Sequence, residues 1–214
     1  MTARRPRRQH PDLELSQTAA RLDPDEYRAW FSKTSQPENI RDLLGLAGAV
    51  LVAYELLKRR VVNQTMDFYS AGFDEKGFTY SDRYDTEVLA LHATSPYSAS
   101  CAWLVKSGAI TEQQVVILEE LHEVRGRMTH ELLGYLVDPA FTVRAGLLPD
   151  VLGVLRALAL FWARIAMDTN PDFDGRDVAD EEISSGDLLI FEQLLVVVAR
   201  IEEHRTSRGT DPLA

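Results

Sequence analysis

The chain has 214 residues, of which 45% are hydrophobic and 26% are charged. This is enough apolar sequence to bury one sizeable core, which excludes collagen-like, wholly disordered and disulfide-framed proteins. The 23 Lys and Arg residues against 33 Asp and Glu give a net charge of −10, which argues against bulk DNA or RNA binding through a positive field. The single cysteine, Cys101, can form neither an intrachain disulfide nor a zinc site, and it favours a reducing cytoplasm.

The N-terminal segment, residues 1–22, is predicted to be a flexible basic arm. Its arginines are followed by proline, histidine and aspartate instead of an apolar h-region, so we expect no secretory signal. The least polar run, residues 43–54, is too short to span a bilayer and indicates a buried helix. No contact with a membrane is therefore expected.

Helix starts are clearly marked after this arm. Asp23 and Pro24 are typical of an N-cap and a first helical residue, and they predict a short helix through Trp30. A second helix start of this kind occurs at Pro37. The apolar pattern that follows contains no further proline and predicts a long helix over about 37–69.

The next segment, residues 70–95, shows neither a helical nor a strand period over its first half. We expect a long ordered loop there, with one short helix near 85–91. Ser95 and Pro96 then predict the start of another short helix.

Three further helices are predicted in the second half of the chain. Thr111 begins a capping box, and the apolar patterns cover residues 112–137, 149–167 and 188–201. The tail, residues 207–214, is predicted to be disordered. The expected fold is all-α, an up-and-down helical bundle within a single domain over 23–206. It is built on two long antiparallel helices, about 37–69 and 112–137.

The second long helix carries the candidate functional residues. Its apolar positions recur three and four residues apart and define a core-facing stripe, made up of Ile117, Leu121, Val124, Met128, Leu132 and Tyr135. His130 lies roughly 160° from the centre of this stripe. Glu123 and Arg127 lie on the same helix face as His130. Arg125 lies nearer the core, at roughly 60° from the centre of the stripe. On helix geometry alone, Glu123 and Arg127 form an ordinary solvated i, i+4 ion pair. Three more leucines widen the apolar surface, which indicates either a widely wrapped helix or a covering second subunit.

The segment Arg125-Gly-Arg-Met-Thr-His130, on the second of two long helices, resembles the R-x4–6-H signature of the HEPN superfamily. The first long helix and the segments 98–108 and 136–139 are similar to a bacterial branch associated with plasmids and defence loci. The resemblance covers roughly residues 38–205.

This resemblance implies a metal-independent endoribonuclease, a toxin or anti-phage defence effector, that works as a cytoplasmic homodimer with a composite active site. His130 is then the acid/base group for attack of the RNA 2′-hydroxyl on the adjacent phosphate, and Arg125 binds that phosphate. The helical wheel adds Arg127 as a second phosphate contact and Glu123 as an orienting group. Besides RNA and a second copy, an antitoxin or other defence partner protein is expected.

One alternative stays open, because catalytic members of the superfamily commonly place a polar residue directly after the motif arginine, where this chain has Gly126. The alternative is a non-catalytic helical module that binds RNA, a nucleotide or a partner protein. No cofactor or metal is expected. Glu119-x-x-His122 is only half of a di-iron site, and the sequence lacks P-loop, dinucleotide-binding and serine-hydrolase motifs.

Overall fold

The computed structural model describes residues 23–75, 77–138, 141–144, 146–173, 176 and 178–209. The predicted N-terminal arm, residues 1–22, and the last five residues of the predicted tail lie outside the described residues. The described chain is mostly helical, as the sequence predicts, with one two-stranded sheet. No helix among the described residues has the length and apolar character needed to cross a membrane.

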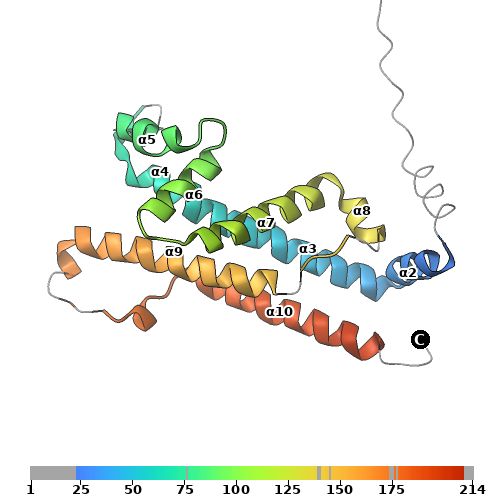
Figure 1. Ribbon diagram of the computed structural model, residues 1–214. Helices are drawn as coiled ribbons and strands as arrows, with labels where there is room; N and C mark the ends of the chain where they lie inside the picture. The colour runs from blue at the N-terminus through green and yellow to red at the C-terminus, as the bar shows by residue number, and fades with distance from the viewer. Residues whose placement is uncertain are drawn as a thin grey trace, which may run out of the picture.

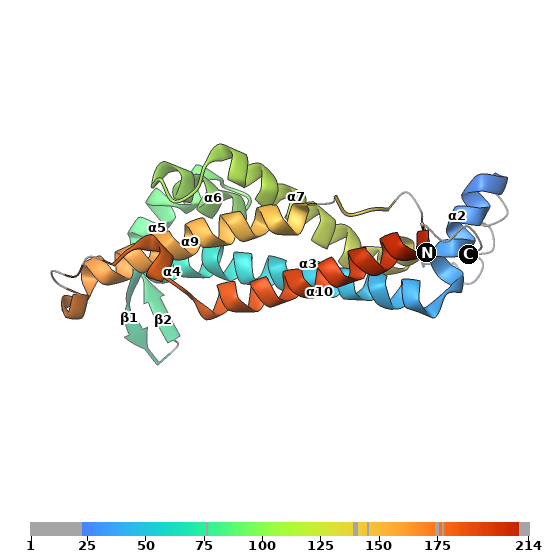
Figure 2. The same ribbon diagram turned by 90° about the horizontal axis from the view of Figure 1, so that it is seen from below.

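Long helices run along the axis of an elongated molecule (Figures 1 and 2), and they are α3 (Pro37–Lys58), α7 (Glu112–His130), α9 (Leu147–Thr169) and α10 (Gly186–Gly209). α3 contacts the other three. α3 and α9 run in one direction and α7 and α10 in the other. All four contribute to one core that includes the buried side chains of Leu57, Leu118, Leu121, Leu155, Leu158 and Phe191. Each of the four helices therefore buries apolar side chains against a neighbour, which is the main source of helix stability in a folded chain.

The helical path of α3 continues beyond Lys58, as the sequence predicts for 37–69. A π-helical turn, η1 (Arg59–Asn63), leads into α4 (Gln64–Phe68). At this turn the indole N–H of Trp162 donates to the Arg60 carbonyl at 3.0 Å, and Arg60 Nε lies 2.9 Å from Asp187 Oδ2. The turn is thus tied to both α9 and α10.

Shorter helices complete the described chain, and several of them begin where the sequence marks a cap. They are α2 (Pro24–Ser35), α5 (Asp82–Glu87), η2 (Leu89–Leu91), α6 (Pro96–Lys106), α8 (Leu132–Val137), η3 (Pro171–Phe173) and η4 (Asp180–Glu182). The Ser95 hydroxyl accepts from the Ser98 backbone N–H at 3.1 Å at the start of α6. The capping box at Thr111 is present in full at the start of α7.

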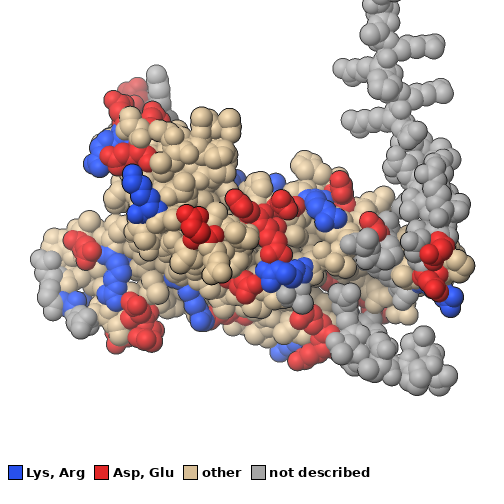
Figure 3. All heavy atoms as spheres, viewed as in Figure 1, with Lys and Arg blue, Asp and Glu red and all other residues tan. Residues whose placement is uncertain are grey.

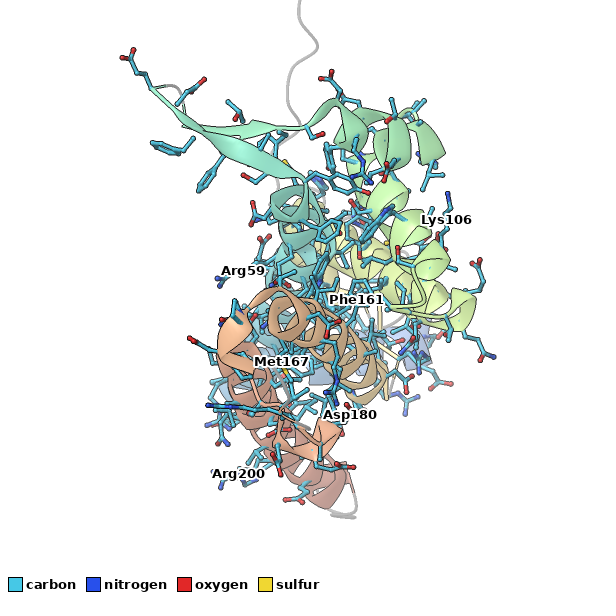
Figure 4. The ribbon with its side chains drawn as sticks, turned by 90° about the vertical axis from the view of Figure 1, so that its left-hand side faces the viewer. Arg59, Lys106, Phe161, Met167, Asp180 and Arg200 are labelled. Carbon is cyan, nitrogen blue, oxygen red and sulfur yellow. The ribbon has the colours of Figure 1, made fainter. Side chains whose placement is uncertain are left out.

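The loop expected at the start of residues 70–95 is in fact a β-hairpin. β1 (Ser70–Asp74) pairs antiparallel with β2 (Gly77–Tyr80), and Phe73 lies opposite Phe78. The hairpin projects from the bundle (Figures 2 and 4), so its strands lack the alternating burial that makes a strand visible in sequence. Gly77, at φ +117°, adopts a backbone conformation at the turn that favours glycine.

The second long helix is not continuous over 112–137, contrary to the sequence prediction. Glu131 leaves the helical conformation at φ −130° and ψ 38°, so α7 ends at His130 and α8 takes a new direction. Tyr135 is thereby buried against Phe141, with ring centroids 5.1 Å apart. Leu132, expected in the core stripe, is instead 41% exposed.

Candidate functional site

His130 is the last residue of α7, and its side chain is exposed. The backbone just before it is held by Thr129, whose hydroxyl donates to the carbonyls of Arg125 at 2.6 Å and Gly126 at 3.1 Å. Because the chain turns at Glu131, α8 does not continue along the axis of α7 and does not extend that helix past His130. His130 is therefore accessible at the end of a well-anchored helix.

Arg125 is half-buried on the side of α7 that faces α3. Its guanidinium carbon lies 4.8 Å from the centroid of the Tyr54 ring (a cation–π contact). Burial raises the pKa of Tyr54, and the Arg125 charge opposes this rise. The arginine is thus held by a ring face that leaves its N–H donors without a carboxylate partner among the described residues.

Arg127 and Glu123 do not form the ion pair that their spacing allows within the described structure. The Arg127 guanidinium carbon lies 3.8 Å from the centroid of the Phe141 ring instead. Glu123 is exposed one turn earlier on α7. Arg127, like Arg125, is therefore held by an aromatic ring.

The predicted site residues are divided between different sides of α7. Arg125 and His130 are five residues apart, which places them about 140° apart around the helix axis. The structure accordingly has Arg125 against α3 and His130 in solvent. Glu123 and Arg127 belong to the side of His130. A single protomer does not present Arg125 and His130 on one face.

Sequence reasoning missed the residues that do lie beside Arg125. The His122 ring stacks on Tyr97, with centroids 5.4 Å apart and planes at 28°, and lies 5.5 Å from the Tyr54 ring. His122 precedes Arg125 by three residues, a spacing that places two side chains on one helix face. This spacing was a visible signal, whereas the positions of Tyr54 and Tyr97 depend on helices remote in sequence.

Tyr97 and Cys101 lie on α6 behind this cluster. The Tyr97 hydroxyl is buried and has no hydrogen-bond partner among the described residues. Burial raises the pKa of Tyr97 well above its usual range. Burial, with a smaller contribution from the charge of Glu119, raises the pKa of the Cys101 thiol to about 12. Both groups are therefore neutral near pH 7.

A small cavity lies on another part of the molecule, between α3, the start of α9 and α10. Its volume is about 210 Å³, and its lining includes Leu46, Val143, Arg144, Leu148, Leu195 and Val198. None of the predicted site residues lines it. This volume is below the range of about 300–1,000 Å³ that is usual for small-molecule sites.

Charges on the described surface are mixed. On the face drawn in Figure 3, Lys and Arg side chains are scattered among carboxylates. The acidic turns η3 and η4 lie at the end of the bundle that is remote from α8 (Figure 1). Figure 4 looks along the bundle, with Lys106 and Arg200 on its outside. The carboxylates of η3 and η4 are therefore distant from the end of α7 that carries His130.

A scan of protein-family models, a search of curated proteins and a search of solved structures each gave no match to this chain. The resemblance to the HEPN superfamily therefore rests on the residues quoted for it. In the part of the chain that the structure describes, no three His, Cys, Asp or Glu side chains gather as a metal site requires.

Proposed function

We propose that this protein is a metal-independent endoribonuclease of the HEPN type, a toxin or anti-phage defence effector whose active site is completed by a second copy of the chain. One observation carries the proposal. Arg125 and Arg127 rest on aromatic rings instead of carboxylates in the described structure, within about one and a half turns of the exposed imidazole of His130. Arg127 lies on the side of His130 in one protomer, and Arg125 is available to face the His130 of a second copy; two such guanidinium groups with an imidazole suit a phosphodiester.

The chemistry needs only proton transfer and charge stabilisation, because RNA supplies its own nucleophile. The 2′-oxygen bonds to the adjacent phosphorus while the bond from phosphorus to the 5′-oxygen breaks, leaving a 2′,3′-cyclic phosphate and a 5′-hydroxyl. One imidazole accepts the 2′-hydroxyl proton and another protonates the leaving oxygen. Arg125 and Arg127 stabilise the charge that develops on the phosphoryl oxygens, and Glu123 orients the groups on its side of α7.

A second copy is part of the proposal because Arg125 and His130 diverge around α7. Two motifs that face each other would bring His130 of one copy toward Arg125 of the other. Leu132 and Leu133, which directly follow the motif on α8, are 41% and 45% exposed. Exposed apolar side chains beside the motif suit an isologous contact between two copies.

Gly126 favours a second candidate, a non-catalytic module that binds RNA, a nucleotide or an antitoxin-like partner protein. Apart from its chain neighbours and its own helix backbone, a Cβ placed at this glycine would meet no atom within 4 Å, so the position after Arg125 is open and contributes no side chain to RNA. RNA binding by such a module depends on the arginines and needs no imidazole. His130→Ala then leaves it unchanged.

The test is cleavage of total cellular RNA by the purified chain in the presence of EDTA. Wild type is expected to cut the RNA, and His130→Ala and Arg125→Ala should each lower the rate at least about 100-fold, the usual range for an acid/base group. His92→Ala, at an exposed histidine outside the motif, is the matched control and should keep full activity. Intact RNA with wild type sinks the nuclease proposal. Salt-dependent RNA binding by both wild type and His130→Ala would then establish the binding module.

A further inference from the structure

The two histidines of α7 have different surroundings. His130 stands in solvent at the helix end, whereas His122 is held against the rings of Tyr54 and Tyr97 at 5.5 and 5.4 Å between centroids. The Arg125 guanidinium carbon lies 4.8 Å from the centroid of the same Tyr54 ring. His122, and not His130, is therefore the histidine that the fold places beside Arg125.

The two tyrosines form a rigid base for this pair. Tyr54 is only 6% exposed near the end of α3, and its ring stacks on Tyr97 with centroids 6.3 Å apart. Rings packed in this way limit the rotamers of the side chains that rest on them, as acid/base and phosphate-binding groups require. His122 itself is still exposed, so its ring edge remains accessible to a substrate.

The surroundings of the pair also leave room for an anion. Neither His122 nor Arg125 is ion-paired with a carboxylate within the described residues, although Glu119 lies one turn before His122. Gly126 follows His122 by four residues, so it lies on the same helix face. Nothing lies within 4 Å of the position that a Cβ of Gly126 would occupy. His122 is exposed and Arg125 is only half-buried, so a phosphate can approach both groups from solvent.

We propose that His122 is a second catalytic acid/base residue of the RNA cleavage, acting beside Arg125 on the same phosphodiester. This inference rests on the proposed function. Arg125 holds the non-bridging oxygens, and neutral His122 accepts the 2′-hydroxyl proton as the 2′-oxygen bonds to phosphorus. The bond to the 5′-oxygen breaks, and the imidazolium of His130 from the second copy protonates that oxygen. The site then draws one imidazole from each chain.

The decisive variant is His122→Phe, which keeps a ring against Tyr54 and Tyr97 but removes both ring nitrogens. With the full-length protein, an RNA oligonucleotide and EDTA, kcat should fall at least about 100-fold while the thermal unfolding midpoint stays near that of wild type. Wild type, with one base and one acid, should show a rate that falls on both sides of an optimal pH, and the residual rate of the variant should fall on only one side. His92→Phe serves as the matched control and should retain wild-type kcat.

A second measurement separates chemistry from packing. His122→Ala leaves space where the imidazole lay against the two tyrosine rings, and added imidazole should restore its rate at least about tenfold if the lost group transfers a proton. Cleavage by His122→Phe within about threefold of wild type, or inactivity of His122→Ala without rescue, overturns the inference and leaves His130 as the acid/base group. If wild type itself cuts no RNA, the proposed function has failed, which is a different result from a normally active His122→Phe.

Discussion

At the scale of single residues, two kinds of contact distinguish the arginines of the motif from other arginines of the described structure. Arg60 and Arg144 are paired with carboxylates, at 2.9 Å from Asp187 and 2.8 Å from Glu120. Arg125 and Arg127 lie on aromatic rings instead. A carboxylate neutralises a guanidinium, whereas a ring face fixes its direction and leaves most of its N–H groups free to donate. The two motif arginines are therefore suited to bind an anion, and the paired ones to hold helices together.

Cys101 provides a test of the core beside this site. Its side chain is 3% exposed, and burial raises the pKa of its thiol to about 12. Because the thiolate is the reactive form, we expect Cys101 to react with a disulfide reagent at pH 8 at least about 100-fold more slowly in the folded chain than in urea. Reaction of the native protein at the rate of the unfolded one would contradict the buried position.

The same pKa shift predicts how stability depends on pH. The folded-state pKa lies above the value of about 8.5 for an unfolded cysteine, so the unfolded chain loses its thiol proton first as the pH rises. The free energy of unfolding should therefore decrease between about pH 8.5 and 12. Urea titrations across this range should show a shallower decrease for Cys101→Ala than for wild type. Equal slopes would show that the thiol titrates alike in both states.

At the scale of elements, the end of α7 defines the candidate site. The break at Glu131 places His130 at a terminus and aims α8 so that Tyr135 reaches Phe141. Phe141 also carries the Arg127 guanidinium. One change in backbone direction thus exposes the imidazole and positions a guanidinium, because both depend on where α8 and the following segment lie.

Gly126 makes a prediction about α7 itself. It lies inside the helix, and a Cβ there would meet no atom within 4 Å. Gly126→Ala should raise the free energy of unfolding by about 0.5–1 kcal/mol, because alanine loses less backbone entropy in a helix. Gly153→Ala on α9, with equally open space, should give a similar gain in urea unfolding.

A contrasting glycine provides the control. At Gly45 a Cβ would meet Ile201 Cδ1 at 2.9 Å, so Gly45→Ala should gain less than Gly126→Ala, or lose stability. A loss of stability in Gly126→Ala would mean that α7 packs more closely at the motif than the structure shows.

At the scale of the whole molecule, two of the apolar surfaces that the described residues leave exposed are candidates for a contact between copies. One lies at Leu132 and Leu133, directly after the motif. The other is a stripe on the outer face of α10, formed by Leu189, Ile190, Val196 and Val197, each about half exposed. Only the first lies next to His130 in the chain. The proposed composite site therefore requires that the surface at Leu132 and Leu133 forms the contact between copies.

Leu133→Glu and Leu189→Glu form a matched pair that tests this requirement. A charge buried at a subunit contact without a partner is costly, so Leu133→Glu should weaken the dimer at least about 100-fold and abolish RNA cleavage. Leu189→Glu should retain both properties. Sedimentation over a concentration series gives the dimer dissociation constant. A dimer lost only in Leu189→Glu would place the contact on α10 and remove the composite site.

The elements that could be predicted are those whose signals are local. Ser95, Thr111 and the proline at position 37 act within one helical turn, and α6, α7 and α3 begin where these residues predict. The β1–β2 hairpin was missed because its strands are short, β1 is exposed throughout, and neither strand has a fully buried residue. The break at Glu131 was missed because no proline or glycine stands there.

The sequence by itself determined a mostly helical chain, the approximate positions of its long helices except the end of the second, and a motif that combines an imidazole with two guanidinium groups. Helix caps and apolar periods depend on residues three or four positions apart, so the sequence alone reveals them. Only the tertiary structure decided that Arg125 lies with His122 on the Tyr54 ring and apart from His130. That choice depends on how α3 and α6 pack against α7, and contacts between helices remote in sequence leave no local pattern.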